Sequence, residues 1–121
     1  MRHATRAYGK VANQTASPRE VEADLLLSAA ARLQAIRDGW DDMSPQLDAA
    51  LMYNRKLWSI FVTSATSKEN PLPAGLRQNV ANLGIFVFQQ TLAIMANPKP
   101  ETLGSLIKIN RELAAGLTAR T

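Results

Sequence analysis

Helix-start signals divide this chain of 121 residues into four segments. Each signal contains a proline: Ser17–Pro18, Ser44–Pro45, Pro73 and Pro100. The first is a capping box, in which Ser17 caps the helix and Glu20 reaches back to it from the first turn. No segment alternates apolar and polar residues with a period of two, so strands are not expected. The predicted helices span residues 18–38, 45–66, 73–96 and 100–116.

Three of these helices carry a single apolar face at helical spacing. In the first it comprises Val21, Leu25, Ala29, Leu33 and Ile36. In the second it comprises Leu47, Ala50, Leu51, Leu57, Trp58, Phe61 and Ala65. In the fourth it comprises Leu103, Leu106, Ile107, Leu113 and Leu117. We therefore predict an all-α fold: a small single-domain bundle of about four amphipathic helices over residues 17–121, preceded by a short extended N-terminal arm, residues 1–16. Gly39 is expected to end the first helix in the left-handed conformation.

Composition argues against an enzyme. Apolar residues make up 46% of the chain and charged residues 20%, as in ordinary globular proteins. The chain has no cysteine, one histidine (His3), and six glycines that are too widely spaced for a phosphate-binding loop. We therefore predict no catalytic, cofactor-binding or metal-binding residues.

The net charge of +4 is spread over both ends of the chain. Residues 1–16 and 72–121 each carry +3, whereas residues 17–71 carry −2. A nucleic-acid binder usually shows one concentrated basic patch, so we favour a solvated surface and expect no direct contact with nucleic acid. The N-terminus lacks the apolar core of a secretory signal, which favours a cytoplasmic protein.

The third helix differs from the others because residues 78–98 contain no charged side chain. Amides interrupt this stretch, so we do not expect it to span a membrane. One apolar stripe comprises Leu76, Val80, Leu83, Val87 and Ile94, and a second comprises Ile85, Phe88, Leu92 and Met95. Either the helix is central in the bundle or one stripe binds a partner, and we favour the central position.

Phe86 lies among amides on the polar side of this helix. An isolated aromatic residue there is either an anchor for a partner or simply a surface residue that covers part of the core. If a partner binds, the candidate contacts are Trp58, Asn79, Asn82, Ile85, Phe86, Phe88, Gln89 and Leu92.

Asn54 and Asn110 interrupt the apolar stripes of the second and fourth helices. A buried amide costs stability unless it is hydrogen-bonded, and such residues often fix how helices pair. We favour a structural role, either pairing of the amides between helices or a bond to a loop carbonyl, over direct recognition of a partner.

Several runs of the sequence resemble the FlaF family of alphaproteobacterial flagellar biosynthesis regulators. They are Tyr8 followed by residues 17–26, then residues 54–58, 72–77, 82–87 and 109–117. The resemblance spans nearly the whole chain and contains no catalytic signature.

The resemblance implies a non-enzymatic cytoplasmic factor that promotes flagellin synthesis and export. Its expected partner is flagellin, bound in a chaperone-like way, with the regulator FlbT as a possible second partner. The alternative is an RNA-binding translational regulator of flagellin messenger RNA that acts with FlbT. A third possibility is that the exposed apolar stripe serves only self-association, and the oligomeric state is left open.

Overall fold

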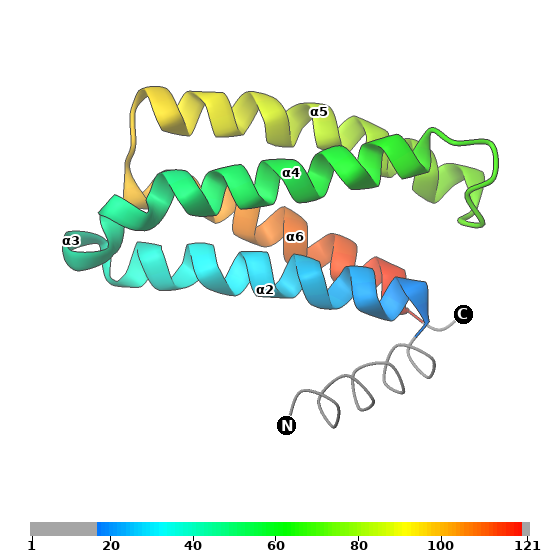
Figure 1. Cartoon of the computed structure of the whole chain (residues 1–121), viewed down its shortest axis with the longest axis horizontal. Coiled ribbons are helices and arrows are strands. Elements are labelled where there is room, and N and C mark those ends of the chain that lie inside the picture. The colour runs from blue at the N-terminus through cyan, green and yellow to red at the C-terminus, as the bar shows by residue number, and fades with distance from the viewer. Residues whose placement is uncertain (1–16, 120–121) are drawn as a thin grey trace, which may run out of the picture.

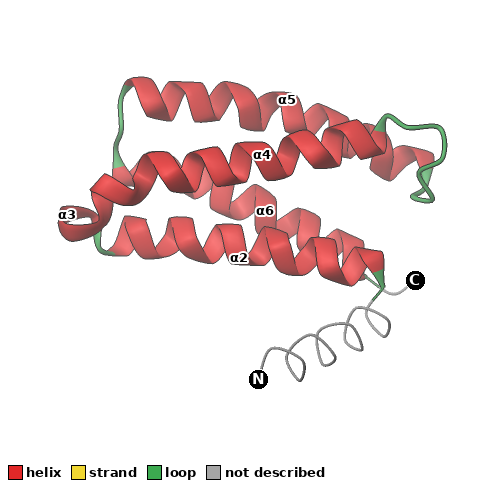
Figure 2. Ribbon diagram, in the orientation of Figure 1, coloured by secondary structure: helices red, strands yellow, loops and turns green. Residues whose placement is uncertain are grey.

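The structure is a computed structural model that describes residues 17–119 as helices joined by short connections (Figures 1 and 2). The α-helices are α2 (Pro18–Asp38), α3 (Trp40–Met43), α4 (Leu47–Ala65), α5 (Ala74–Ala96) and α6 (Gly104–Thr118). Two 3-10 helices, η1 (Ser44–Gln46) and η2 (Pro100–Leu103), lead into α4 and α6. No strand occurs among the described residues, and the all-α prediction is confirmed. The N-terminal arm predicted for residues 1–16 lies outside the described part of the chain.

Local sequence accounts for how these helices begin. The backbone N–H of Glu20 donates to the hydroxyl of Ser17 over 3.2 Å, and Pro18 occupies the first turn, where its missing N–H costs nothing. The segments that begin at Ser44 and Pro100 first form a 3-10 turn, so α4 and α6 start a few residues later than predicted.

The prediction for Gly39 is wrong. Its φ is −108° and its ψ is 37°, which is not the left-handed conformation. Its N–H still donates to the Ala35 carbonyl, and its own carbonyl accepts from the N–H groups of Asp42 and Met43. Because the chain continues to turn in the right-handed sense from α2 into α3, no left-handed residue is needed.

α2, α4 and α5 lie side by side in Figure 1 with α4 in the middle, and α6 lies behind them. α6 makes its most extensive contact with α2, whereas α5 packs mainly on α4. Every apolar residue predicted for the core faces of α4 and α6, or for the turn just before α6, is buried. Among the fully buried side chains is Trp58, whose ring meets Phe61 edge-on at 6.2 Å.

The predicted core face of α2 is partly wrong. Val21 and Leu25 are 37% and 38% exposed, and the buried side instead includes Ala23, Leu26 and Ala30. α2 is enclosed by α4 on one side and by α6 on another, and small alanine side chains let these neighbours approach closely. The large residues next to them on the helix are therefore turned outward.

The favoured position for the third helix, central in the bundle, is also wrong. α5 lies at the edge, and its buried residues are confined to one side: Val80, Gly84, Val87, Thr91 and Ile94. Leu76, Leu83 and Phe88 are partly buried against the core. The second apolar stripe predicted for this helix is largely uncovered, because no described helix packs on that side.

Candidate partner-binding surface

Trp58 was predicted to contact a partner, but the structure places it in the core with 0% exposure. Its indole Nε1–H donates to the side-chain oxygen of Asn110 over 2.9 Å. The Asn110 amide nitrogen in turn donates to the Asn54 side-chain oxygen over 2.7 Å and to the Leu26 carbonyl over 3.4 Å. The indole of Trp58 therefore serves the packing of the bundle, and the prediction of a partner contact is wrong.

This buried network connects three helices. Asn54 and Trp58 belong to α4, Asn110 to α6 and Leu26 to α2. The two amides form the helix-to-helix pair that we expected from their positions in the apolar stripes. α5 contributes no member, so the network connects α2, α4 and α6. The Arg77 side chain of α5 donates instead to the Ser67 carbonyl in the loop after α4, over 3.3 Å.

The predicted partner-binding residues of α5 fall on two different sides of the helix. Ile85 and Leu92 are 58% and 64% exposed and lie two turns apart on one side, with the half-buried Phe88 between them. Phe86, 44% exposed, points away from this side, because successive helix positions differ by about 100°.

The three amides predicted to contact a partner are Asn79, Asn82 and Gln89, and all of them are exposed. They lie on the side of α5 that carries Phe86, or between that side and the side that carries Ile85. The side-chain oxygen of Asn82 accepts a hydrogen bond from the Gln78 amide over 3.0 Å. The structure therefore does not bring all the predicted contacts of α5 together.

Gly84 fixes how α5 sits on α4. A Cβ built on Gly84 would overlap a methyl group of Val62, and it would lie 3.8 Å from the ring of Trp58. The helices run in opposite directions (Figure 1), so positions further along α5 face earlier positions of α4. With a rise of about 1.5 Å per residue, Leu92 lies at the level of Met52.

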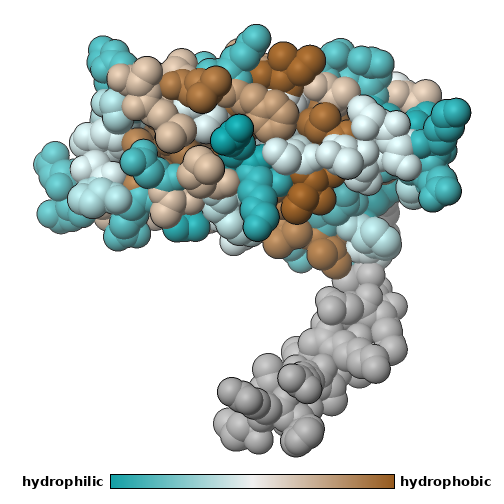
Figure 3. Space-filling view, turned by 45° about the horizontal axis from the view of Figure 1, so that its top comes forward, coloured by the Kyte–Doolittle hydropathy of each residue, from teal (hydrophilic) through white to brown (hydrophobic). Residues whose placement is uncertain are grey.

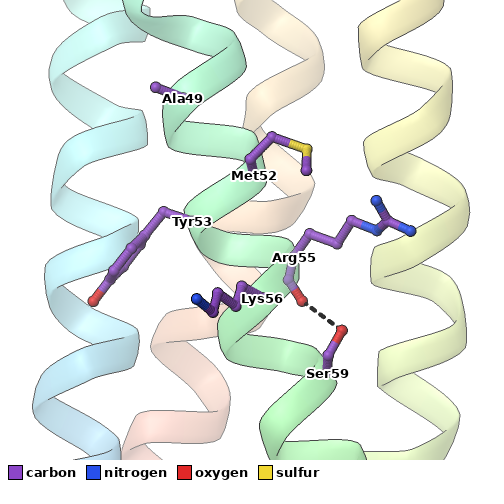
Figure 4. Close-up of a pocket in the computed structure, with 6 residues that line it drawn as sticks. All are labelled: Ala49, Met52, Tyr53, Arg55, Lys56 and Ser59. Atoms are coloured by element: carbon purple, nitrogen blue, oxygen red, sulfur yellow. Dashed lines mark hydrogen bonds between the residues drawn. The ribbon is translucent and has the colours of Figure 1, made fainter.

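On α4, next to this side of α5, lies an open hollow of about 510 Å³ (Figure 4). Its lining residues are Ala49, Met52, Tyr53, Arg55, Lys56 and Ser59. In Figure 4 the side chains of Met52 and Arg55 extend toward α5, whereas Tyr53 extends toward α2. The Ser59 hydroxyl donates to the Arg55 carbonyl over 3.0 Å.

We call the resulting surface the α4–α5 face. It comprises Met52, Arg55, Ile85, Phe88, Leu92 and Met95. Figure 3 shows apolar surface along the upper edge of the molecule, over α5, and in further patches on the side turned toward the viewer. Sequence reasoning expected α4 to contribute Trp58, which is buried, and missed Met52 and Arg55. Met52 and Tyr53, two large apolar residues off the core stripe of their helix, were the signal that could have revealed this part of α4.

The charge of the α4–α5 face comes from α4 alone. α5 has no charged side chain after Arg77, and α4 supplies Arg55 and Lys56. Within residues 17–119 the one salt bridge joins Lys108 to Glu112 on α6, so neither cation of α4 is paired with a carboxylate there.

Catalytic chemistry finds no support in the described residues. No three histidine, aspartate or glutamate side chains within residues 17–119 lie close enough together to hold a metal ion.

α5 is long and apolar enough to cross a membrane by length and composition, although its buried side packs on the bundle.

Glu22 on α2 has a raised pKa. It is half-buried beside the apolar side chains of Phe61 and Leu113, and this burial raises its pKa from the ordinary value of 4.5, while the nearby Arg19 lowers it. Because folding raises the pKa, the ionised form destabilises the fold. Stability should therefore rise as the pH falls through the raised pKa toward 4.5.

We expect Glu22→Gln to raise the urea midpoint at pH 7, because the amide carries no charge to desolvate. The gain should fade as the pH approaches about 4, where the wild-type carboxyl is itself largely protonated. Glu20→Gln is the matched control, since it removes the same charge from an exposed position in the same helix and should give no such gain. Identical midpoints for Glu22→Gln and wild type from pH 4 to 8 would contradict the assignment.

Comparison with known proteins identifies the chain as a whole. A family model described as flagellar protein FlaF matches residues 4–117. No curated protein and no solved structure matches the chain. The match includes every helix described here except the last residue of α6, so it covers the core network and the α4–α5 face alike. The chain therefore belongs to the FlaF family of flagellar proteins.

Proposed function

We propose that this protein is a non-enzymatic flagellar regulator that promotes flagellin synthesis and export. It binds flagellin subunits in the cytoplasm as a chaperone-like adaptor, and the binding surface is the α4–α5 face. FlbT remains a possible second partner that the resemblance suggests.

The observation that carries this proposal is the exposure of Ile85 and Leu92 beside Met52. Large apolar side chains that lie together on a surface usually mark a contact with another molecule. An apolar surface shared by two neighbouring helices suits an amphipathic helix, which lays its apolar stripe against it. Flagellin termini form such helices, and they lack their packing partners until the filament assembles.

The absence of charge along α5 also supports the proposal. Burying a charged side chain against an apolar partner is costly unless the charge is paired. After Arg77, α5 offers only apolar, small and neutral polar side chains. A partner helix can therefore bury the exposed side of α5 without desolvating a charged residue of that helix.

The test is a binding titration of the purified full chain with a fragment of flagellin that contains its terminal helices. We expect wild type to bind and Ile85→Glu to weaken binding at least about tenfold, because a carboxylate would be buried in the contact. Since Ile85 is exposed in the free protein, the variant should melt within a few degrees of wild type.

Phe86→Glu is the matched control, because it places the same charge at the neighbouring position on another side of α5. It should bind like wild type. Loss of binding only in Phe86→Glu would move the surface to the amide side of α5 and leave the function standing. No binding by wild type, together with a gel shift of flagellin leader RNA at low salt, would instead support the RNA-binding alternative.

A further inference from the structure

We infer that the occupant of the α4–α5 face is an amphipathic helix with acidic side chains along the flank that faces α4. This inference rests on the proposed function and deepens it, because it states the chemistry that the bound segment must have. Its basis is the uneven charge of the two helices that form the face.

The two edges of the face differ in charge. Arg55 and Lys56 stand in the middle of α4, and its one carboxylate, Asp48, lies in the first turn. The opposite edge, on α5, carries neutral amides such as Gln89. A helix that fits between these edges would therefore place carboxylates near α4 and uncharged side chains near the amides.

Arg32 of α2 does not belong to this basic edge, because its guanidinium lies on the other side of α4, 5.9 Å from the centre of the Tyr53 ring. Arg55 and Lys56 have no salt bridge to any carboxylate within residues 17–119. An acidic partner would supply the missing counter-charges.

Charge also argues against two other occupants. A second copy of the chain, placed with the same face inward, would bring the Arg55 and Lys56 of both copies into one contact without supplying acidic side chains to balance them. The chain's own residues 1–16 carry three basic side chains and no acidic one, so they too would be repelled. An acidic helix from another protein fits better than either.

The length of the face sets the size of the contact. Ile85 and Met95 lie at its two ends along α5, about 15 Å apart at 1.5 Å per residue. A partner helix therefore needs about three turns to cover it, with apolar residues at the three- and four-residue spacing that such grooves recognise.

Two synthetic peptides of about 18 residues provide a test that does not depend on flagellin. Both carry the same leucine stripe, and the residues that flank it are glutamate in one and lysine in the other. We expect the full chain to bind the glutamate peptide at least about tenfold more tightly, with the preference shrinking as the salt is raised. Equal binding of both peptides would overturn the inference.

Reversing the charges of α4 tests whether this helix causes the preference for the glutamate peptide. Arg55→Glu with Lys56→Glu should reverse the choice between the peptides, and it should also weaken the flagellin fragment about tenfold. Lys108→Glu with Arg111→Glu on α6 is the matched control, because it makes the same change in net charge on another helix and should leave both results unchanged.

The outcomes separate the inference from the proposed function. Flagellin binding that survives the double reversal on α4 would retain the function and overturn the inference. Selective binding of the glutamate peptide without any binding of flagellin would support the inference and contradict the function. Dimerisation that Ile85→Glu abolishes would place a second copy on the face and overturn the inference.

Discussion

Replacing Asn110 with alanine is expected to lower the free energy of unfolding by about 3 to 5 kcal/mol. The side chain is fully buried and makes three hydrogen bonds, to Trp58, Asn54 and the Leu26 carbonyl. Its removal leaves the indole N–H and the Asn54 oxygen buried without partners, and it also leaves a small cavity. Urea denaturation followed by Trp58 fluorescence would measure the loss, which is large against the roughly 5 to 15 kcal/mol of a typical domain.

Asn54→Ala is the matched control for this prediction. It truncates the same side chain at an equally buried position, but Asn54 makes only one hydrogen bond, and its own amide nitrogen has no partner in the structure. Asn110 keeps its bonds to Trp58 and Leu26 in this variant, so the expected loss is smaller, about 1 to 2 kcal/mol. Equal losses in the two variants would show that packing, and not the network, determines the cost.

The core of α4 and α6 could be predicted because large apolar residues there recur at helical spacing. The same spacing also identified Asn54 and Asn110, since a buried amide within an apolar stripe needs a hydrogen-bond partner. The stripe placed Trp58 on the buried face of α4, but the same residue was also expected to contact a partner. A tryptophan on an apolar face is consistent with a core and with a binding site, and its full burial and its hydrogen bond to Asn110 distinguish the two.

α2 shows where hydrophobicity is a poor guide. Val21 and Leu25 are more apolar than Ala23 and Ala30, yet the alanines are buried. Which side of a helix is buried depends on how closely its neighbours approach, and a sequence pattern carries little information about that distance.

The α4–α5 face could be predicted only in part, for a related reason. The second stripe of α5 was visible in the sequence, but the number of neighbours around a helix was not. From α4 only Trp58 was expected, and Arg55 and Lys56 were missed because they resemble ordinary solvated residues. They become informative only when the structure places them beside an apolar surface and away from any carboxylate.

Gly84→Ala is the second substitution from which we expect a large effect, a loss of about 1 to 3 kcal/mol in the free energy of unfolding. Alanine favours helix over glycine by up to about 1 kcal/mol, so an open site would gain stability. At Gly84 the added methyl would overlap Val62, whose branched side chain is stiff in a helix and cannot easily turn aside. α5 would therefore have to move away from α4.

Gly75→Ala is the control, because nothing lies within 4 Å of the added carbon and the helix should gain stability. Combining Gly84→Ala with Val62→Ala removes the obstacle, so the double variant should recover part of the loss. Since Gly84 sets the distance between α4 and α5, the single variant should also bind the flagellin fragment more weakly, although Gly84 itself is buried. A Gly84→Ala protein as stable as Gly75→Ala would mean that the two helices are not held at this spacing, and the groove between them would lose its defined shape.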